Sequence, residues 1–123
     1  MSQQTLRESD LAQFTGSGVL YRHGLFRYHY TEGVQYVAQC GCAYWLIDAI
    51  FSWQREQCIR EDVMLQEIQF WTLQVHDDRS ATLTCERDSN DVAITQSIPW
   101  TDFPLSSIRL YFQEGVLLLP SEY

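Results

Sequence analysis

The chain has 123 residues, of which 46% are hydrophobic and 14% aromatic, and its 16 acidic and 8 basic residues give a net charge of −8. This composition excludes a disordered chain, and the length predicts one domain, residues 1–123, that folds without a disulfide or a metal. Every basic residue is arginine. Such a surface repels a phosphate backbone, so direct nucleic-acid binding is not expected, whereas a basic protein partner is attracted.

The sequence predicts a soluble cytoplasmic protein that does not enter a membrane. Its longest apolar run, residues 43–53, is interrupted by Asp48 and is about half the length of a membrane span. The first ten residues lack the basic and apolar blocks of a secretory signal. The four cysteines lack the spacing of a disulfide framework or a zinc site, so neither a metal nor another cofactor is expected.

The first elements predicted along the chain are short. Ser9 or Asp10 is a suitable cap for a helix that ends near Phe14, before a break at residues 15–18. Residues 19–30 are rich in β-branched and aromatic side chains. They predict a hairpin or two irregular strands.

Residues 31–54 predict two helices separated by a Cys-Gly-Cys break at residues 40–42. Thr31 is a suitable N-cap for the first helix, and Gly41 ends it. The second helix, about residues 43–54, is apolar almost all the way round, so we expect it to be central and buried. Its narrow polar stripe comprises Tyr44, Asp48, Ser52 and Arg55.

From Glu67 onward, the period of the apolar residues changes from about 3.6 to 2. Alternating runs begin near Trp71, Ala81, Val92 and Ile108, and turn-forming clusters at residues 77–80 and 88–91 separate the first three. This pattern predicts an antiparallel meander of about four or five strands with one face exposed to water. The predicted fold class is α+β, with the N-terminal helices packed on one face of the C-terminal meander.

Motifs spread along the chain support a resemblance. They are Phe14-Thr15-Gly16-Ser17, Tyr21-Arg22-His23, Thr31-Glu32-Gly33-Val34, Ala43-Tyr44-Trp45-Leu46-Ile47-Asp48, Thr101-Asp102-Phe103-Pro104-Leu105 and Leu118-Leu119-Pro120-Ser121-Glu122-Tyr123. In this order they resemble a family of small bacterial and mobile-element proteins that is classed as a domain of unknown function. The resemblance covers nearly the whole chain and implies a compact intracellular domain. It brings no catalytic or binding residues, and a role in phage or plasmid conflict with a host is only an association.

The first candidate site is an acidic rim. If the meander brings two acidic turns together at one end of the sheet, their carboxylates imitate phosphates and fit the basic groove of a nucleic-acid-binding protein. Solvated turns are the simpler interpretation of the same residues. The residues of this acidic rim are Asp77, Asp78, Glu86, Asp88 and Asp91.

The second candidate is a pocket between the sheet and helix 43–54, with Asp48, Tyr44 and His23 as its polar groups. A buried Asp48 would act as a general base with a raised pKa. On the polar stripe it would instead pair with an arginine such as Arg22. No recognised catalytic signature accompanies these residues, so an enzyme is the less favoured class.

The leading hypothesis is therefore a non-enzymatic protein that binds a protein partner through the acidic rim. Inhibition of a nucleic-acid-handling or host-defence system is the role that fits such a surface. The alternative is a small enzyme or ligand-binding domain that uses the pocket. A third alternative is self-association as a homodimer, through exposed aromatic residues or a bare edge strand.

Overall fold

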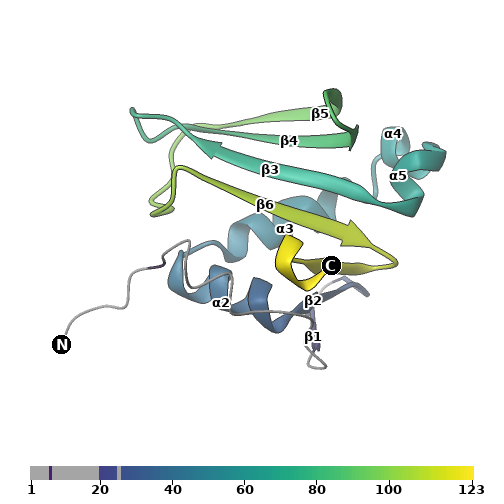
Figure 1. The fold of residues 1–123 in the computed structure, drawn as a ribbon, viewed down its shortest axis with the longest axis horizontal. Coiled ribbons are helices and arrows are strands. Elements are labelled where there is room, and N and C mark those ends of the chain that lie inside the picture. The colour runs from purple at the N-terminus through teal and green to yellow at the C-terminus, as the bar shows by residue number, and fades with distance from the viewer. Residues whose placement is uncertain (1–5, 7–19, 25) are drawn as a thin grey trace.

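The computed structural model describes residues 6, 20–24 and 26–123, so the helix predicted between Ser9 or Asp10 and Phe14 lies outside the described residues. The described part is α+β, as predicted (Figure 1). Its helices are α2 (Glu32–Cys40), α3 (Tyr44–Trp53), α4 (Gln57–Arg60) and α5 (Val63–Glu67). Its strands are β1 (Leu20–Arg22), β2 (His29–Thr31), β3 (Gln69–Val75), β4 (Ala81–Asp88), β5 (Asp91–Ile98), β6 (Ser107–Gln113) and β7 (Val116–Leu118), and a 3₁₀ turn, η1 (Pro120–Glu122), follows.

The described strands form one seven-stranded sheet in the order β1-β2-β7-β6-β3-β4-β5. This corrects the expected meander of four or five strands in two ways. First, the β1–β2 hairpin joins the sheet because β2 pairs with β7 in parallel. Second, β6 pairs with β3 and not with β5, so residues 99–106 cross from one edge of the β3–β5 unit to the other. This crossing places the apolar side of β6 in the middle of the sheet, where it is buried.

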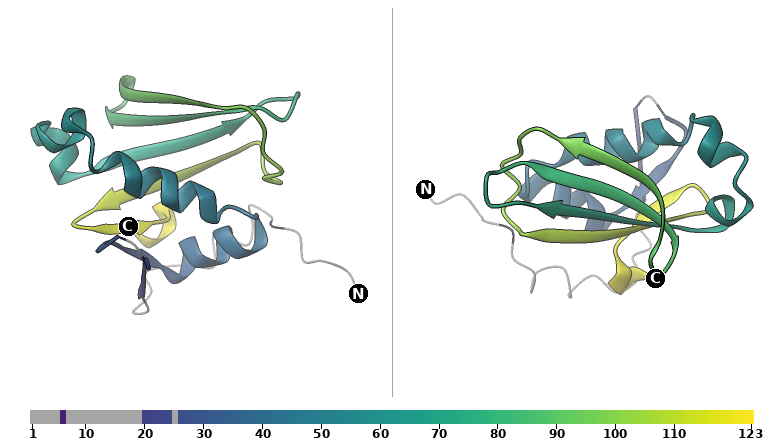
Figure 2. Two further views of the ribbon diagram at one scale, coloured as in Figure 1. Left: turned by 180° about the vertical axis from the view of Figure 1, so that it is seen from behind. Right: turned by 90° about the horizontal axis from the view of Figure 1, so that it is seen from above.

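Helices α2 and α3 lie on one face of the sheet in all three views (Figures 1 and 2). The apolar residues of the alternating pattern face the helices: Trp71 and Leu73 of β3 lie on the covered face, and each side chain is 1% exposed. Their register partners Cys85, Leu83, Leu110 and Ile108 are buried with them. The helix-covered face therefore holds the core.

The opposite face of the sheet is polar. Its central row runs from Arg109 through Thr72 and Thr84 to Thr95 across four adjacent strands. These side chains are half-buried or exposed. This confirms the prediction of a sheet with one face exposed to water.

Helix α2 begins and ends where the sequence predicts. The Thr31 hydroxyl oxygen accepts a hydrogen bond from the N–H of Val34, and Gly41 is the C-cap. The carboxylate of Glu122 adds a second cap. Its Oε1 accepts a hydrogen bond from the Thr31 hydroxyl, with an O···O distance of 2.6 Å, and its Oε2 accepts one from the Gly33 N–H, with an N···O distance of 3.3 Å. The C-terminal turn is thereby tied to the start of α2.

Helix α3 is the central element. Ile50 and Phe51 are both 0% exposed, whereas Tyr44 and Asp48 are exposed on its outer side. The ring of Phe51 contacts the rings of Tyr28 and Phe112 at centroid distances of 5.4 and 5.8 Å. The helix predicted over residues 43–54 is thus confirmed, with narrower observed bounds.

The end of α3 is joined to the start of β3 by a reciprocal pair of side-chain amides. Gln54 and Gln69 are 7% and 1% exposed, and each Nε2 donates to the other's Oε1 at 2.7 Å. The remaining donors bond to the carbonyl oxygens of Ile50 and Leu65, and Trp71 Nε1 donates to Gln69 Oε1 at 2.8 Å. No buried side-chain nitrogen or oxygen of the described residues lacks a hydrogen-bond partner. The hydrogen bonds of the pair therefore offset the cost of burying the two amides.

Gln69→Leu is expected to lower the free energy of unfolding by roughly 2–4 kcal/mol, because it leaves Oε1 and one amide N–H of Gln54 and the N–H of Trp71 without partners. Denaturant unfolding followed by tryptophan fluorescence measures this loss. Gln74→Leu is the matched control: Gln74 is exposed on the same strand, so its replacement should change stability by less than about 0.5 kcal/mol. Equal losses in the two variants would contradict the role given to the amide pair.

Cys85 gives the fold an alkaline pH dependence. Its side chain is 0% exposed, and burial raises the pKa of its thiol from 9.0 to about 12. Above pH 9 the unfolded chain releases this proton while the folded chain keeps it. The free energy of unfolding therefore falls as the pH rises from 9 toward 12.

Between pH 8 and pH 10 the free energy of unfolding of the native protein should fall by about 1 kcal/mol more than that of the Cys85→Val variant, which lacks this thiol. Parallel denaturant titrations of the two proteins at both pH values measure the difference. Other titrating groups are present in both proteins and cancel. Identical pH slopes would show that the Cys85 thiol ionises normally in the folded state.

Candidate functional site

A hollow of about 470 Å³ lies where α3 ends, between the sheet and the short helices α4 and α5. We call it the arginine pocket. Its walls come from elements far apart in the sequence, which the fold brings together. The lining residues are Arg27, Tyr28, Gln54, Arg55, Arg60, Leu65, Gln66, Gln69, Phe112, Glu114 and Gly115.

Three arginines line the pocket, each from a different segment. Arg27 precedes β2, Arg55 follows α3, and Arg60 is the last residue of α4. The guanidinium carbon of Arg55 lies 4.8 Å from the centre of the Phe26 ring, and that of Arg27 lies 6.0 Å from the centre of the Tyr28 ring. The Phe26 ring is within cation–π distance of Arg55 and leaves its N–H groups available, whereas Arg27 is at the outer limit of such a contact.

The pocket arginines differ from Arg79, Arg87 and Arg109, although Arg22 of β1 also forms no ion pair with a described carboxylate. Arg87 pairs with Asp62 at 2.6 Å and Asp91 at 3.0 Å, and Arg109 lies 4.0 Å from Glu86. Arg79 donates to the backbone carbonyls of residues 101 and 103. By contrast, none of Arg27, Arg55 and Arg60 forms an ion pair with a carboxylate of the described residues.

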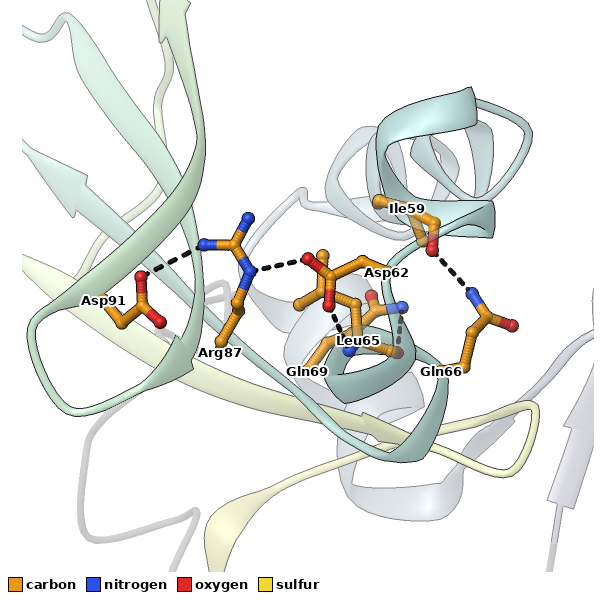
Figure 3. A network of polar contacts seen from close by, with 7 residues as sticks. All are labelled: Ile59, Asp62, Leu65, Gln66, Gln69, Arg87 and Asp91. Atoms are coloured by element: carbon orange, nitrogen blue, oxygen red, sulfur yellow. Dashed lines mark hydrogen bonds and ion pairs between the residues drawn. The ribbon is translucent and has the colours of Figure 1, made fainter.

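The floor of the pocket is held by a network that Figure 3 shows. Gln66 Nε2 donates to the carbonyl of Ile59, which fixes α5 against α4. Asp62 caps α5 by accepting the N–H of Leu65, and Arg87 ties Asp62 to the sheet. The hydrogen bonds from Arg87 and Leu65 lower the pKa of Asp62, so this anchor stays ionised at neutral pH.

Glu114 is the acidic residue that lines the pocket, and it lies in the turn between β6 and β7. The register Gln113↔Val116 places Glu114 and Gly115 at the two central positions of this turn. Glu114 and Gly115 have φ values of 52° and 78°. Both residues therefore have a left-handed backbone conformation, as in the two central residues of a type I′ hairpin turn. Asparagine or aspartate is favoured at the first of these two positions, and glutamate is not.

The chemistry of the pocket is that of an anion site. Three guanidinium groups and one carboxylate line it, whereas the chain as a whole has a net charge of −8. Arginine N–H groups match the oxygens of carboxylates and phosphates, and a partly enclosed site strengthens that attraction. The volume is sufficient for a small organic anion.

The predicted pocket residues Asp48, Tyr44 and His23 lie elsewhere. Nε2 of His23 is 2.5 Å from Oδ1 of Asp48, and the N–H of Phe26 donates to Nδ1 of His23 at 3.3 Å. A nitrogen that accepts carries no proton, so this arrangement indicates that Nε2 holds the ring proton and donates it to Asp48. Asp48 thus pairs with a histidine where an arginine was expected, and its side chain is 60% exposed.

Tyr44 is separate from that pair, because its hydroxyl donates to Gln35 at 2.9 Å. None of Asp48, Tyr44 and His23 lines the arginine pocket. The pocket predicted between the sheet and helix 43–54, with these three polar groups, is therefore a different place from the arginine pocket, which lies beyond the end of that helix.

The residues of the acidic rim are divided between the two ends of β4. Asp77 and Asp78 lie in the turn between β3 and β4, whereas Glu86, Asp88 and Asp91 surround the turn between β4 and β5. Successive turns of an antiparallel unit lie at opposite ends of the sheet. The condition for a continuous rim is therefore not met.

Several of these carboxylates are also engaged locally. Asp78 accepts from the N–H and the hydroxyl of Ser80, which lowers its pKa, and Asp88 accepts from the N–H of Ser89. Glu86 accepts from the N–H of Asn90, and Asp91 pairs with Arg87. The acidic residues thus stabilise their own turns.

The cysteines and a metal site were also considered in the sequence. Cys40 is half-buried, Cys42 and Cys58 are exposed, and Cys85 is buried, all as free thiols. Among the described residues, no group of three or more His, Cys, Asp or Glu side chains is placed to hold a metal ion. No helix of the described part is long and apolar enough to span a membrane.

The sequence did not single out Arg27, Arg60 and Glu114, and it placed Arg55 only on the polar stripe of α3. One signal was present: residues 55–61 contain two arginines in a short hydrophilic stretch between two apolar segments. Arg27 and Glu114 join them only through the pairing of β2 with β7, which no local pattern reveals.

Comparison with known proteins identifies the family but not the activity. Searches of curated proteins and of solved structures found no match to this chain. A family match covers residues 5–123, nearly the whole length, which confirms the suspected domain of unknown function. The chain belongs to the family described as "Family of unknown function (DUF6876)".

Proposed function

We propose that this chain is a binding domain for a small organic anion, which it holds in the arginine pocket. Of the three functions that the sequence left open, this one develops the ligand-binding alternative. It transfers the role from Asp48, Tyr44 and His23 to Arg27, Arg55 and Arg60.

One observation carries the proposal: three guanidinium groups line one hollow of a strongly acidic protein without an ion pair to any described carboxylate. Acidic residues outnumber arginines two to one in the chain. Clustering three cations raises the free energy of the empty protein through mutual repulsion. A bound anion relieves that repulsion, so the cluster is explained by a ligand.

The charge of the rest of the molecule restricts the size of this ligand. A long polyanion would extend past the pocket over a surface with an excess of negative charge. A small anion remains within the field of the three arginines. The proposal therefore concerns a soluble small molecule and not a nucleic acid.

The acidic turns give less support to a protein partner. Their carboxylates lie at opposite ends of β4 and several are engaged in local hydrogen bonds and ion pairs. A partner with a basic surface would have to displace those contacts. We therefore rank inhibition of another protein through the acidic rim below ligand binding.

Pyrophosphate is a simple probe of the pocket. Isothermal titration calorimetry at low salt should show one saturable site, and Arg55→Gln and Arg60→Gln should each weaken binding by about tenfold or more, because each removes a charge-assisted hydrogen bond. Raising the salt concentration should weaken binding to the native protein, because the attraction is electrostatic.

Arg109→Gln is the matched control, since it makes the same change of charge on the open face of the sheet, away from the pocket. It should leave the affinity within about twofold of the native value, as expected for a charge outside the site. Equal weakening in all three variants would indicate a general charge effect. Either that result or an absence of binding would contradict the proposed function.

A further inference from the structure

We infer that the ligand of the arginine pocket is a small phosphate monoester whose organic part carries hydroxyl groups, in the manner of a sugar phosphate, and that Glu114 selects it. This inference rests on the proposed function, because it assigns the chemistry of the ligand and one residue that recognises it. It goes beyond anion binding in requiring a neutral hydrogen-bond donor on the ligand.

The number and origin of the arginines favour a phosphoryl group. Arg27, Arg55 and Arg60 come from three separate segments and line the same pocket. A monoester phosphate has three terminal oxygens in a tetrahedral arrangement and a charge between about −1.5 and −2 at neutral pH. A single carboxylate has two oxygens in one plane and half that charge, so it cannot use all three cations equally well.

Glu114 requires a different explanation. Its carboxylate lines the same pocket but forms no ion pair with an arginine of the described residues. Its charge lowers the net charge of the lining side chains from +3 to +2, and it repels any anion that enters. A carboxylate is useful there only if the ligand presents a donor, such as a hydroxyl group, that it can accept.

The backbone of Glu114 supports this assignment. Its φ of 52° is left-handed, a conformation that costs a residue other than glycine or asparagine some stability. The turn alone would be served better by asparagine or aspartate. A longer carboxylate at a strained position beside a pocket points to a binding role for the side chain.

The walls favour a hydroxylated group over a flat aromatic base. Phe112 is 7% exposed and Leu65 is 2% exposed, so they offer little free apolar surface. The Tyr28 ring is half-buried against the rings of Phe51 and Phe112. The remaining lining comes from the exposed polar side chains of Arg27, Arg55, Arg60, Gln66 and Glu114, which can form hydrogen bonds with hydroxyl groups.

The test compares three probes of matched chemistry by calorimetry: methyl phosphate, which carries the charge alone, ribose, which carries the hydroxyl groups alone, and ribose 5-phosphate. The native protein should bind ribose 5-phosphate at least about tenfold more tightly than methyl phosphate, because a hydroxyl donates to an ionised carboxylate. Binding of ribose alone should be too weak to detect. In Glu114→Gln the preference for ribose 5-phosphate should fall to about twofold, because a neutral amide is a weaker acceptor.

Asp77→Asn is the control, because it removes one negative charge from an exposed turn far from the pocket and should keep the full preference.

If methyl phosphate and ribose 5-phosphate bind equally well to the native protein, the pocket is an anion site but the inference is wrong. An unchanged preference in Glu114→Gln also overturns it. Tighter binding of a 5′-phosphorylated oligonucleotide than of ribose 5-phosphate would assign the site to nucleic-acid ends instead. A failure of every anion to bind defeats the proposed function as well, so the two claims are separable.

Discussion

The reciprocal hydrogen bonds between Gln54 and Gln69 are the constraint on which the site depends. They join the end of α3 to the first residue of β3 through two side chains that are almost completely buried. Arg55 follows Gln54 directly, and the carbonyl of Leu65 is bound by Gln69. The position of one arginine and of the pocket floor is therefore set by the same pair. A buried polar network of this kind specifies a single arrangement, because a shift of either side chain leaves several hydrogen-bond donors without acceptors.

The arginines of the described residues make two kinds of contact. Arg87 and Arg109 meet carboxylates, whereas Arg55 lies over an aromatic ring beside the pocket, and Arg27 is at the outer limit of such a contact. The first kind ties strands and helices together. The second kind leaves the N–H groups available for a ligand. In a chain with a net charge of −8, this local excess of positive charge is the observation behind the proposed binding of a small anion.

Local patterns predicted most of the elements, and long-range pairing explains what they missed. The caps at Thr31 and Gly41, the buried helix around Ile50 and the alternation in β3 follow from side chains that are close in sequence. The pairing of β6 with β3 and of β2 with β7 does not follow from such local patterns. Alternation shows which residues of a strand face the core, but it does not show which strand lies beside it.

The same limit explains the candidate sites. Acidic turns were visible in the sequence, but whether they meet depends on which end of the sheet each occupies. Asp48 was conspicuous because it interrupts an apolar helix, yet it lies on the outer side beside His23. The arginine pocket was invisible because its residues are dispersed from Arg27 to Glu114 and are ordinary surface residues in their local context.

The most direct test of the central claim is to observe the arginine side chains themselves. In nuclear magnetic resonance spectra, the Nε–H signals of Arg27, Arg55 and Arg60 should move during a titration with ribose 5-phosphate and saturate with one common dissociation constant. The signals of Arg79 and Arg87 should stay in place, because their N–H groups are already bound within the protein. Small, unsaturable shifts spread over all the arginines would show that the three pocket residues do not form a site.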